Sequence, residues 1–146
     1  METEKSVGAI VVSERGKYLL LDRSAIKGVP VKGSFWEFSK GHVEGEETEM
    51  TTLTREIWEE CGIAEYTPIE GFREEYSYAS SSGNLRLFVF YLIKIPDDRI
   101  VLSEEHKDYK WVTLEEAKGM LPNESWWDIL SKADEFIRLH SPSAKA

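Results

Sequence analysis

Residues 41–63 read GHVEGEETEMTTLTREIWEECGI, and this stretch is the most informative part of the chain. Its second half predicts a helix that begins at about Thr48, because apolar residues recur at spacings of three and four along one face. These residues are Met50, Leu53, Ile57 and Cys61. Gly62 is expected to end the helix in a left-handed conformation. The first half, residues 41–47, is dense in glycine and glutamate and predicts a loop.

The opposite face of this predicted helix carries Glu56, Glu59 and Glu60, whose spacing of i, i+3 and i+4 groups the three carboxylates. Like charges this close raise one another's proton affinity unless a cation lies among them. Hard oxygen ligands on one face suit Mg²⁺ or Mn²⁺. The alternative is a solvated acidic face, on which Arg55 pairs with Glu59 at i+4. The preceding loop makes metal binding the better interpretation.

The whole stretch resembles the Nudix box, Gly-x5-Glu-x7-Arg-Glu-U-x-Glu-Glu-x-Gly-U, in which U is a bulky aliphatic residue. Every defined position matches, namely Gly41, Glu47, Arg55, Glu56, Ile57, Glu59, Glu60, Gly62 and Ile63. The resemblance implies a Mg²⁺-dependent Nudix hydrolase, with Mn²⁺ as a substitute ion, that uses water to cleave a phosphoanhydride bond in a nucleoside diphosphate derivative. It also implies an α/β fold, the Nudix-type α/β/α sandwich with a mixed β-sheet between helices.

The resemblance assigns roles to individual residues. The metal ligands that it implies are Gly41, Glu56, Glu59, Glu60 and Glu105. The catalytic residues that it implies are Glu56, Glu59, Glu105, Arg55 and Glu47. Among these, Arg55 and Glu47 hold the loop against the helix, and Glu56 and Glu105 are alternatives for the general base. A divalent cation at this site would neutralise a pyrophosphate, polarise phosphorus and lower the pKa of a bound water.

Outside the box, the sequence is similar to the asymmetrical diadenosine tetraphosphate hydrolases. The similarity lies in Trp36, residues 40–44 (KGHVE), residues 69–72 (IEGF) with Tyr78, and residues 102–106 (LSEEH) followed by Tyr109 and Trp111. It implies that Lys40 and Tyr78 contact phosphates and that Tyr109 flanks a nucleoside. The residues expected to bind substrate are Lys40, His42, Tyr78, Arg86 and Tyr109. The reaction implied is cleavage of diadenosine tetraphosphate to ATP and AMP.

Two departures from this subfamily leave other functions open. The Pro-Gly pair of the family's box loop is Gly45-Glu46 here, and the hairpin loop at residues 80–84 has no lysine to bind phosphate. The alternative is a Nudix pyrophosphatase for nucleoside triphosphates, ADP-ribose or nucleotide sugars. The segment Trp36-Glu37-Phe38 is similar to the corresponding segment of the nucleoside triphosphate pyrophosphatases. A non-catalytic nucleotide-binding sensor should have lost a helix glutamate, yet all are present. Only Trp126-Trp127 would support a third hypothesis, a purely structural oligomerisation domain. These residues are more simply explained as the anchor of the C-terminal helix on the core.

Composition narrows the partners and the location. The formal net charge of −9 disfavours nucleic acid and membranes as partners, since phosphate contacts there need clustered Lys and Arg. We therefore expect a small nucleotide substrate and a monomer or homodimer. The single cysteine, Cys61, excludes an internal disulfide framework and favours a reducing cytoplasm. The N-terminus lacks the pattern of a signal peptide, and the apolar run 87–93 is too short to span a membrane.

The length of 146 residues predicts a single domain over residues 1–146, which the resemblance implies is a Nudix domain, with a frayed tail at residues 141–146. Alternating or apolar runs predict strands at residues 7–12, 18–21, 67–79, 85–95 and 110–112. Helices are expected at residues 114–120 and 126–139. Residues 25–34 contain Gly28, Pro30 and Gly33 and are expected to form a loop.

Overall fold

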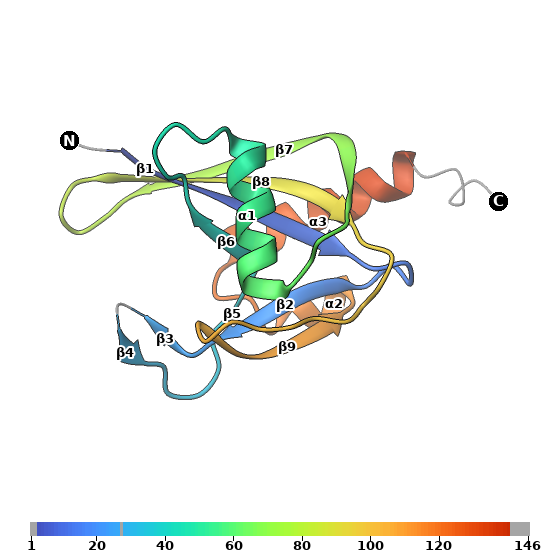
Figure 1. The fold of residues 1–146 in the computed structure, drawn as a ribbon, viewed down its shortest axis with the longest axis horizontal. Helices are drawn as coiled ribbons and strands as arrows, with labels where there is room; N and C mark the ends of the chain where they lie inside the picture. The colour runs from blue at the N-terminus through green and yellow to red at the C-terminus, as the bar shows by residue number, and fades with distance from the viewer. Residues whose placement is uncertain (1–2, 27, 141–146) are drawn as a thin grey trace.

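The computed structural model describes residues 3–26 and 28–140, and Figure 1 shows how they are arranged. The strands are β1 (Thr3–Val12), β2 (Tyr18–Arg23), β3 (Ala25–Ile26), β4 (Val29–Pro30), β5 (Trp36–Glu37), β6 (Ser39–His42), β7 (Thr67–Ala79), β8 (Leu85–Lys94) and β9 (His106–Val112). The helices are α1 (Glu49–Cys61), α2 (Leu114–Lys118) and α3 (Glu124–His140).

Among the described residues, seven strands form one mixed sheet in the order β5-β2-β1-β8-β7, with β6 also paired to β1 and β9 to β2. Strand β1 runs parallel to β8, from Thr3 opposite Leu85 to Val12 opposite Lys94. In Figure 1, α1 lies in front of the sheet, and α2 and α3 lie behind it. The α/β/α sandwich expected from the sequence is thus confirmed.

Separate apolar clusters cover the two faces of the sheet, because successive side chains of a strand point to opposite faces. From β1, Val7, Ala9 and Val11 pack with α1, whereas Ile10 and Val12 pack with α3. The helix residues in these clusters are Leu53, Ile57 and Cys61 of α1 and Trp126, Ile129, Leu130 and Ala133 of α3. Burial on both faces explains the nearly continuous apolar runs of the central strands.

Helix α1 has the ends that the sequence predicts. The side chain of Thr48 accepts a hydrogen bond from the backbone N–H of Thr51 and so caps the N-terminus. Gly62 has a φ of 68° and donates its N–H to the carbonyl of Trp58, so the left-handed cap is confirmed. Leu53, Ile57 and Cys61 are buried, so the packing of this face fixes the orientation of the glutamates on the rest of the helix.

Three expectations about local structure need correction or comment. The loop predicted at residues 41–47 is wrong at its start, because Gly41 and His42 end β6 and pair with Val7 and Ser6 of β1. Residues 25–34 include the short β3–β4 pair, and β9 begins at His106 instead of residue 110. These strands are defined by partners distant in sequence, which a short run cannot reveal. The predicted frayed tail at residues 141–146 lies outside the described residues.

Within the described residues, we find no helix whose length and apolar character would allow it to cross a membrane.

Candidate functional site

A cavity of about 570 Å³, here called the acidic cavity, lies where α1 faces the end of β6 and the segment that precedes β9. Its lining residues are Ser6, Arg23, Lys40, Gly41, His42, Glu44, Arg55, Glu56, Glu59, Glu60, Ser103, Glu104 and Glu105. The structure thus brings all the predicted metal ligands to one cavity, although Glu105 is distant from the others in sequence.

Gly41 and Glu56 approach each other so closely that a side chain at position 41 is excluded. A Cβ atom on Gly41 would overlap the carboxyl group of Glu56. Burial raises the pKa of Glu56, Arg55 opposes this shift, and the charges of Glu59 and Glu105 add to it. A nearby cation therefore stabilises the ionised form of the half-buried Glu56.

Glu60 is the most buried of the three helix glutamates, with 3% of its surface exposed. Its Oε1 atom accepts hydrogen bonds from Ser39 Oγ at 2.7 Å and from the backbone N–H of Lys40 at 3.1 Å. Burial raises the pKa of Glu60 to about 8, and the neighbouring Glu56 and Glu105 contribute to this shift. A cation beside Glu60 would favour the ionised carboxylate and reverse this effect.

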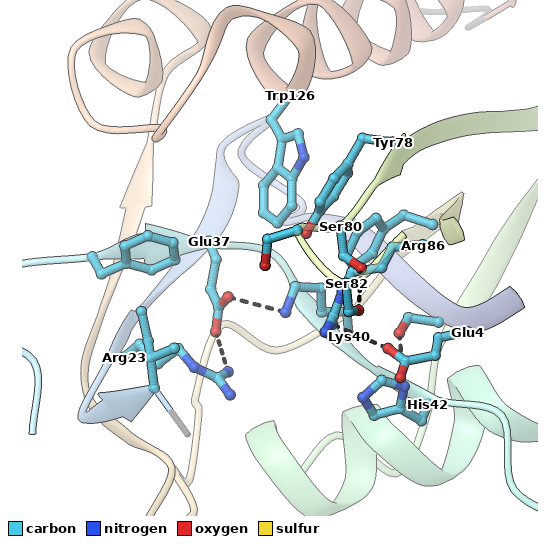
Figure 2. A pocket seen from close by; sticks show the side chains of 15 residues that line it. Glu4, Arg23, Glu37, Lys40, His42, Tyr78, Ser80, Ser82, Arg86 and Trp126 are labelled. Atoms are coloured by element: carbon cyan, nitrogen blue, oxygen red, sulfur yellow. Dashed lines mark hydrogen bonds and ion pairs between the residues drawn. The ribbon is translucent and has the colours of Figure 1, made fainter. Parts of the chain in front are cut away.

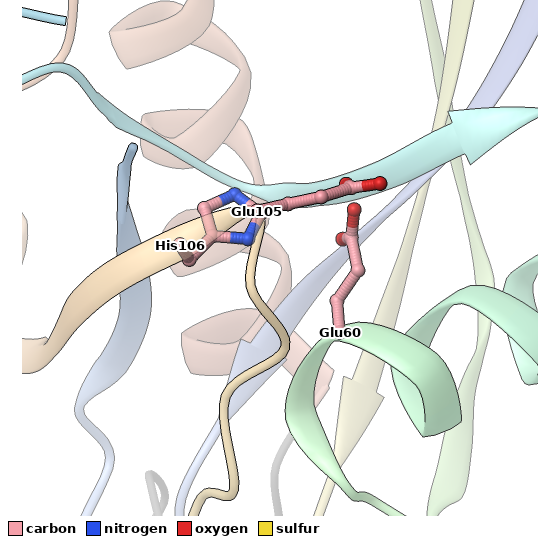
Figure 3. A group of neighbouring side chains, drawn as sticks. All are labelled: Glu60, Glu105 and His106. Atoms are coloured by element: carbon pink, nitrogen blue, oxygen red, sulfur yellow. The ribbon is translucent and has the colours of Figure 1, made fainter. Parts of the chain in front are cut away.

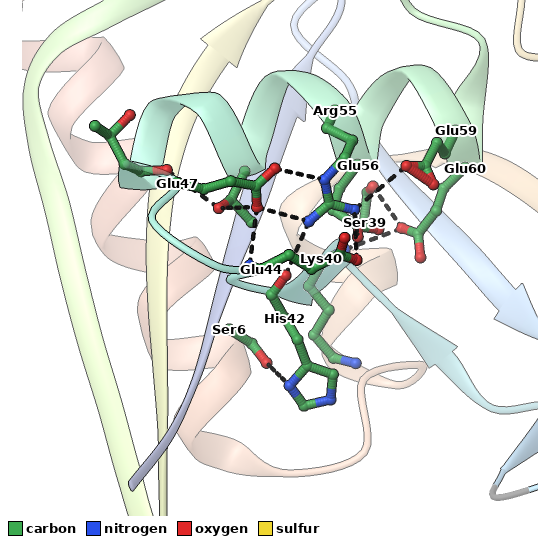
Figure 4. Close-up of polar contacts among 12 residues, drawn as sticks. Ser6, Ser39, Lys40, His42, Glu44, Glu47, Arg55, Glu56, Glu59 and Glu60 are labelled. Carbon is green, nitrogen blue, oxygen red and sulfur yellow. Dashed lines mark hydrogen bonds and ion pairs between the residues drawn. The ribbon is translucent and has the colours of Figure 1, made fainter.

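Arg55 joins the segment between β6 and α1 to the helix (Figure 4). Its Nε and Nη2 atoms donate to Glu47 at 2.8 and 2.9 Å, and Nη2 also donates to the carbonyl of His42 at 2.9 Å. Its Nη1 atom donates to Glu56 at 2.6 Å and to Glu59 at 3.3 Å. The hydrogen bonds from Arg55 lower the pKa of Glu47 to about 2. Arg55 therefore fixes the loop and two of the helix carboxylates together.

The acidic cavity has the donor chemistry for a divalent metal ion. Glu60, Glu105 and His106 each offer a ligand atom, and these atoms lie within 4.8 Å of one another. Glu56 and Glu59 face the same cavity from α1. Carboxylate oxygens dominate the set. Burial raises the pKa values of Glu56 and Glu60, and neighbouring carboxylates add to both shifts.

A second cavity, of about 700 Å³ and here called the aromatic cavity, adjoins the first (Figure 2). Its lining residues are Glu4, Ser6, Arg23, Ile26, Phe35, Glu37, Lys40, His42, Tyr78, Ser80, Ser81, Ser82, Arg86, Phe88 and Trp126. Tyr78 stacks on Phe88 with ring centroids 6.2 Å apart, and Trp126 meets Phe88 edge to face at 5.8 Å. The cavity thus offers aromatic surface together with three basic side chains, Arg23, Lys40 and Arg86.

Glu37 links the two cavities through the cations that line both. Its carboxylate lies 2.7 Å from Nη1 of Arg23, 3.2 Å from Nζ of Lys40 and 2.8 Å from Nε2 of His106. Burial raises the pKa of Glu37, but the hydrogen bond with His106 and the charges of Lys40 and Arg23 outweigh it and lower the value to about 2. Glu37 is therefore a buried, ionised carboxylate that holds Arg23 and Lys40 at the junction of the cavities.

The predicted substrate-binding residues separate into two groups. Lys40 and His42 line both cavities, and Tyr78 and Arg86 line the aromatic cavity. Tyr109 is half-buried against the apolar cluster beneath α1 and is not among the described residues that line either cavity. The loop at residues 80–84 contributes serines to the aromatic cavity, in agreement with its lack of lysine.

Sequence reasoning did not select Arg23, Glu37, Phe88 and Trp126, which line the cavities. It also did not select His106, which neighbours Glu60 and Glu105. Glu37 had one usable signal, since a carboxylate flanked by Trp36 and Phe38 in an apolar segment requires buried cationic partners. Trp126 anchors α3 in the core as expected and also forms a cavity wall. Arg23 and His106 face each other across the β2–β9 pairing, which no local pattern reveals.

Comparison with known proteins adds four findings. Residues 2–131 match the NUDIX domain family. The chain is 33% identical over 136 residues to the mouse (Mus musculus) asymmetrical bis(5'-nucleosyl)-tetraphosphatase, covering 88% of this chain and 92% of that protein. It is 32% identical over 112 residues to the Escherichia coli CTP pyrophosphohydrolase, covering 76% and 77% of the two chains. A solved C. elegans Ap4A hydrolase binary complex superposes with a TM-score of 0.80 and 28% identity, covering 92% of this chain and 97% of that one.

Proposed function

The chain belongs to the Nudix hydrolase family, and from this premise we propose that it cleaves diadenosine tetraphosphate asymmetrically, to ATP and AMP, with Mg²⁺. The observation that carries the proposal is the junction of an acidic cavity with an aromatic cavity through the shared cations Arg23 and Lys40. A long polyphosphate chain with a nucleoside attached fits that combination of charges and aromatic surface.

Glu56, Glu59, Glu60, Glu105 and the Gly41 carbonyl are the groups that would hold Mg²⁺ in this proposal. The bound ion would supply charge neutralisation at the phosphates and activation of the attacking water. Arg55 keeps Glu56 and Glu59 in place, and Ser39 does the same for Glu60. These hydrogen bonds limit the reorganisation that the site must undergo during catalysis.

Lys40, Arg23 and Arg86 would bind the phosphate chain, which offsets the absence of lysine from the loop at residues 80–84. Side chains of Arg23 and Lys40 are 25% and 17% exposed, so both present surface toward the cavities while Glu37 holds them. In the reaction, the water oxygen bonds to phosphorus, the anhydride P–O bond breaks, and one proton passes to a carboxylate. Glu56 and Glu105 are the two candidates for that proton acceptor, because both lie in the acidic cavity.

Tyr78 and Tyr109 are the two candidates for the side chain that stacks on the nucleoside base. Stacking of a base on an aromatic side chain contributes roughly 1 to 3 kcal/mol to binding. We expect Tyr78→Ala to raise KM accordingly with a smaller change in kcat, because Tyr78 lines the aromatic cavity. Steady-state kinetics of Tyr78→Ala and Tyr109→Ala, measured in parallel, assign the contact. A KM increase confined to Tyr109→Ala would place the base outside the aromatic cavity.

A product assay tests the proposed activity. Purified enzyme with Mg²⁺ is given diadenosine polyphosphates, nucleoside triphosphates and ADP-ribose, and the nucleotide products are separated. Equal amounts of ATP and AMP from diadenosine tetraphosphate, with a higher kcat/KM than for the other substrates, are expected. Two ADP per substrate, or no turnover of this substrate, would refute the proposal.

A nucleoside triphosphate pyrophosphatase is the second candidate. The similarity to the E. coli CTP pyrophosphohydrolase favours it, and so does the Trp36-Glu37-Phe38 segment, whose Glu37 holds Arg23 in this structure. The same assay decides between the two, because this activity would release pyrophosphate and a nucleoside monophosphate. We also propose a cytoplasmic location, in keeping with the single buried cysteine.

A further inference from the structure

His106 has a buried ring nitrogen that the proposed mechanism does not use. Its side chain is 0% exposed, and its Nδ1 atom has no hydrogen-bond partner among the described residues. Figure 3 shows the imidazole beside the carboxylates of Glu60 and Glu105, with which it shares the 4.8 Å cluster of ligand atoms. A buried polar atom without a partner costs free energy, so its position next to two carboxylates calls for an explanation.

The contact with Glu37 determines which ring nitrogen carries the proton in neutral His106. Glu37 accepts from Arg23 and lies beside Lys40, and an ionised carboxylate offers only acceptor atoms. Nε2 of His106, at 2.8 Å from Glu37, therefore donates to it. This tautomer leaves Nδ1 as an unprotonated acceptor.

A ring nitrogen of His106 and one carboxylate oxygen each from Glu60 and Glu105 lie within 4.8 Å of one another. Because Nε2 contacts Glu37, Nδ1 is the nitrogen left to act as a ligand. Imidazole binds transition metals through one nitrogen while the other donates to a carboxylate, which fixes the ring and increases its basicity. The contact between Glu37 and His106 reproduces this arrangement without any change of side-chain position.

We propose that Nδ1 of His106 is a nitrogen ligand that, with Glu60 and Glu105, binds a divalent transition-metal ion such as Mn²⁺ or Co²⁺. The inference rests on the metal dependence in the proposed function and specifies which ion one part of the site prefers. Imidazole nitrogen favours transition metals over Mg²⁺, whereas the oxygen ligands Gly41, Glu56 and Glu59 suit Mg²⁺. The site would therefore have one mixed nitrogen and oxygen position and one position with oxygen ligands alone.

Pulsed electron paramagnetic resonance of bound Mn²⁺ tests the proposal without nucleotide. The chain has three histidines, so protein labelled with ¹⁵N-histidine identifies any imidazole bound to the ion. A ¹⁵N coupling is expected in the unmodified protein, retained in His42→Gln and His140→Gln and lost in His106→Gln. His42 lines the acidic cavity, so His42→Gln controls for a histidine that is near the ion without binding it. His140 lies at the exposed end of α3, so His140→Gln controls for the loss of any histidine. Absence of the coupling from the unmodified protein, or its loss in His42→Gln, would overturn the proposal.

Calorimetric binding of Co²⁺ and Mg²⁺ separates ligation from structural support. His106→Gln removes the proposed ligand itself, so it should weaken Co²⁺ binding by at least the roughly tenfold to hundredfold typical of losing an outer group that orients a ligand, and weaken Mg²⁺ binding much less. Glu37→Gln should act in the same direction, because a glutamine amide can donate to Nε2 and so allow a proton on Nδ1. Equal losses for both ions would show that His106 only supports the fold.

The spectrum of the unmodified protein remains decisive even if His106→Gln fails to fold. Failure of the proposed function is recognised separately, since it appears in the nucleotide products and not in the metal spectrum.

Discussion

The contact between Gly41 and Glu56 makes the catalytic site sensitive to a single methyl group. Ala at position 41 would push the Glu56 carboxyl group aside, because a Cβ atom there overlaps it. A displacement of about 1 Å in a catalytic site can cost on the order of a hundredfold in rate. We therefore expect Gly41→Ala to lower kcat by about that factor while the far-ultraviolet circular dichroism spectrum stays unchanged.

Gly119→Ala provides the matched control for this substitution. Gly119 has a φ of −83°, and a Cβ atom there would meet its nearest neighbour at 3.9 Å. Its rate should stay close to that of the unmodified enzyme. A Gly41→Ala enzyme of normal kcat would show that the position of Glu56 does not limit the reaction.

The buried Glu60 should make the stability of the metal-free protein depend on pH. Burial raises its pKa from 4.5 to about 8, so the folded state binds a proton more tightly than the unfolded chain. The resulting stabilisation is complete below pH 4.5 and is lost as pH rises through about 8. Thermal unfolding in a chelator should show a melting temperature that falls over this window, and Glu60→Gln should flatten the slope.

Saturating Mg²⁺ should also reduce the slope, because a bound cation favours the ionised carboxylate. Binding of the ion then releases a proton, so metal affinity and turnover should both increase toward alkaline pH. If the melting temperature fell with pH equally in Mg²⁺ and in chelator, Glu60 would not be a metal ligand.

At the level of elements, Arg55 connects α1 to the loop after β6 through contacts that a lysine cannot reproduce. Its guanidinium reaches Glu47, the His42 carbonyl, Glu56 and Glu59 at the same time. Lysine keeps the charge but has a single nitrogen. Arg55→Lys should therefore weaken Mg²⁺ binding and lower kcat by about tenfold or more, as measured by calorimetry and steady-state kinetics.

Arg73→Lys is a suitable control for Arg55→Lys. Arg73 of β7 also binds α1 through several nitrogen atoms, since Nε and Nη2 donate to Glu49 at 3.0 and 2.8 Å. Glu49 lies at the N-terminal end of α1 and is not among the described residues that line the acidic cavity. Equal losses of activity in the two variants would mean that Arg55 acts only by stabilising the helix.

The elements predicted from local sequence patterns were those with strong local signals. The spacing of Leu53, Ile57 and Cys61 and the glycine that follows them were enough to place α1 and its end. The run at residues 67–79 likewise matches β7. β6 and the start of β9 were missed, because each is short and is held by backbone hydrogen bonds to β1 or β2. Local propensity has little influence on such strands.

At the scale of the whole molecule, the candidate site combines segments that no single motif contains. The box supplied the ligands from Gly41 to Glu60, and resemblance alone indicated Glu105. Neither indicated that β2 would bring Arg23 to the junction of the two cavities, or that β5 would supply the buried Glu37 that holds it. Such pairings depend on the register of strands across the sheet, which the sequence does not specify locally.

Arg23 at this junction should determine how tightly the phosphate chain binds. A hydrogen bond to a charged group contributes about 1.5 to 3 kcal/mol, so Arg23→Gln should raise KM for diadenosine tetraphosphate by roughly tenfold to a hundredfold. The change in kcat should be smaller, because the contact is formed with substrate as well as with the transition state. Steady-state kinetics with the same substrate provide both constants.

Arg99→Gln serves as the control for charge, because the side chain of Arg99 is 81% exposed and pairs with Asp97. Its KM should remain that of the unmodified enzyme. If both variants raised KM to the same extent, the effect would come from net charge and not from a contact at the junction.

The parallel pairing of β1 with β8 has a consequence for the order in which the chain folds. Thr3 lies opposite Leu85, so the centre of the sheet joins two segments that are far apart along the chain. Closing so long a loop costs entropy before its contacts can repay it, and topologies of this kind fold more slowly than helical bundles of similar size. During synthesis on the ribosome, all of α1 is made before β8. The glutamates of α1 can therefore take their final positions only after the later half of the chain has completed the sheet.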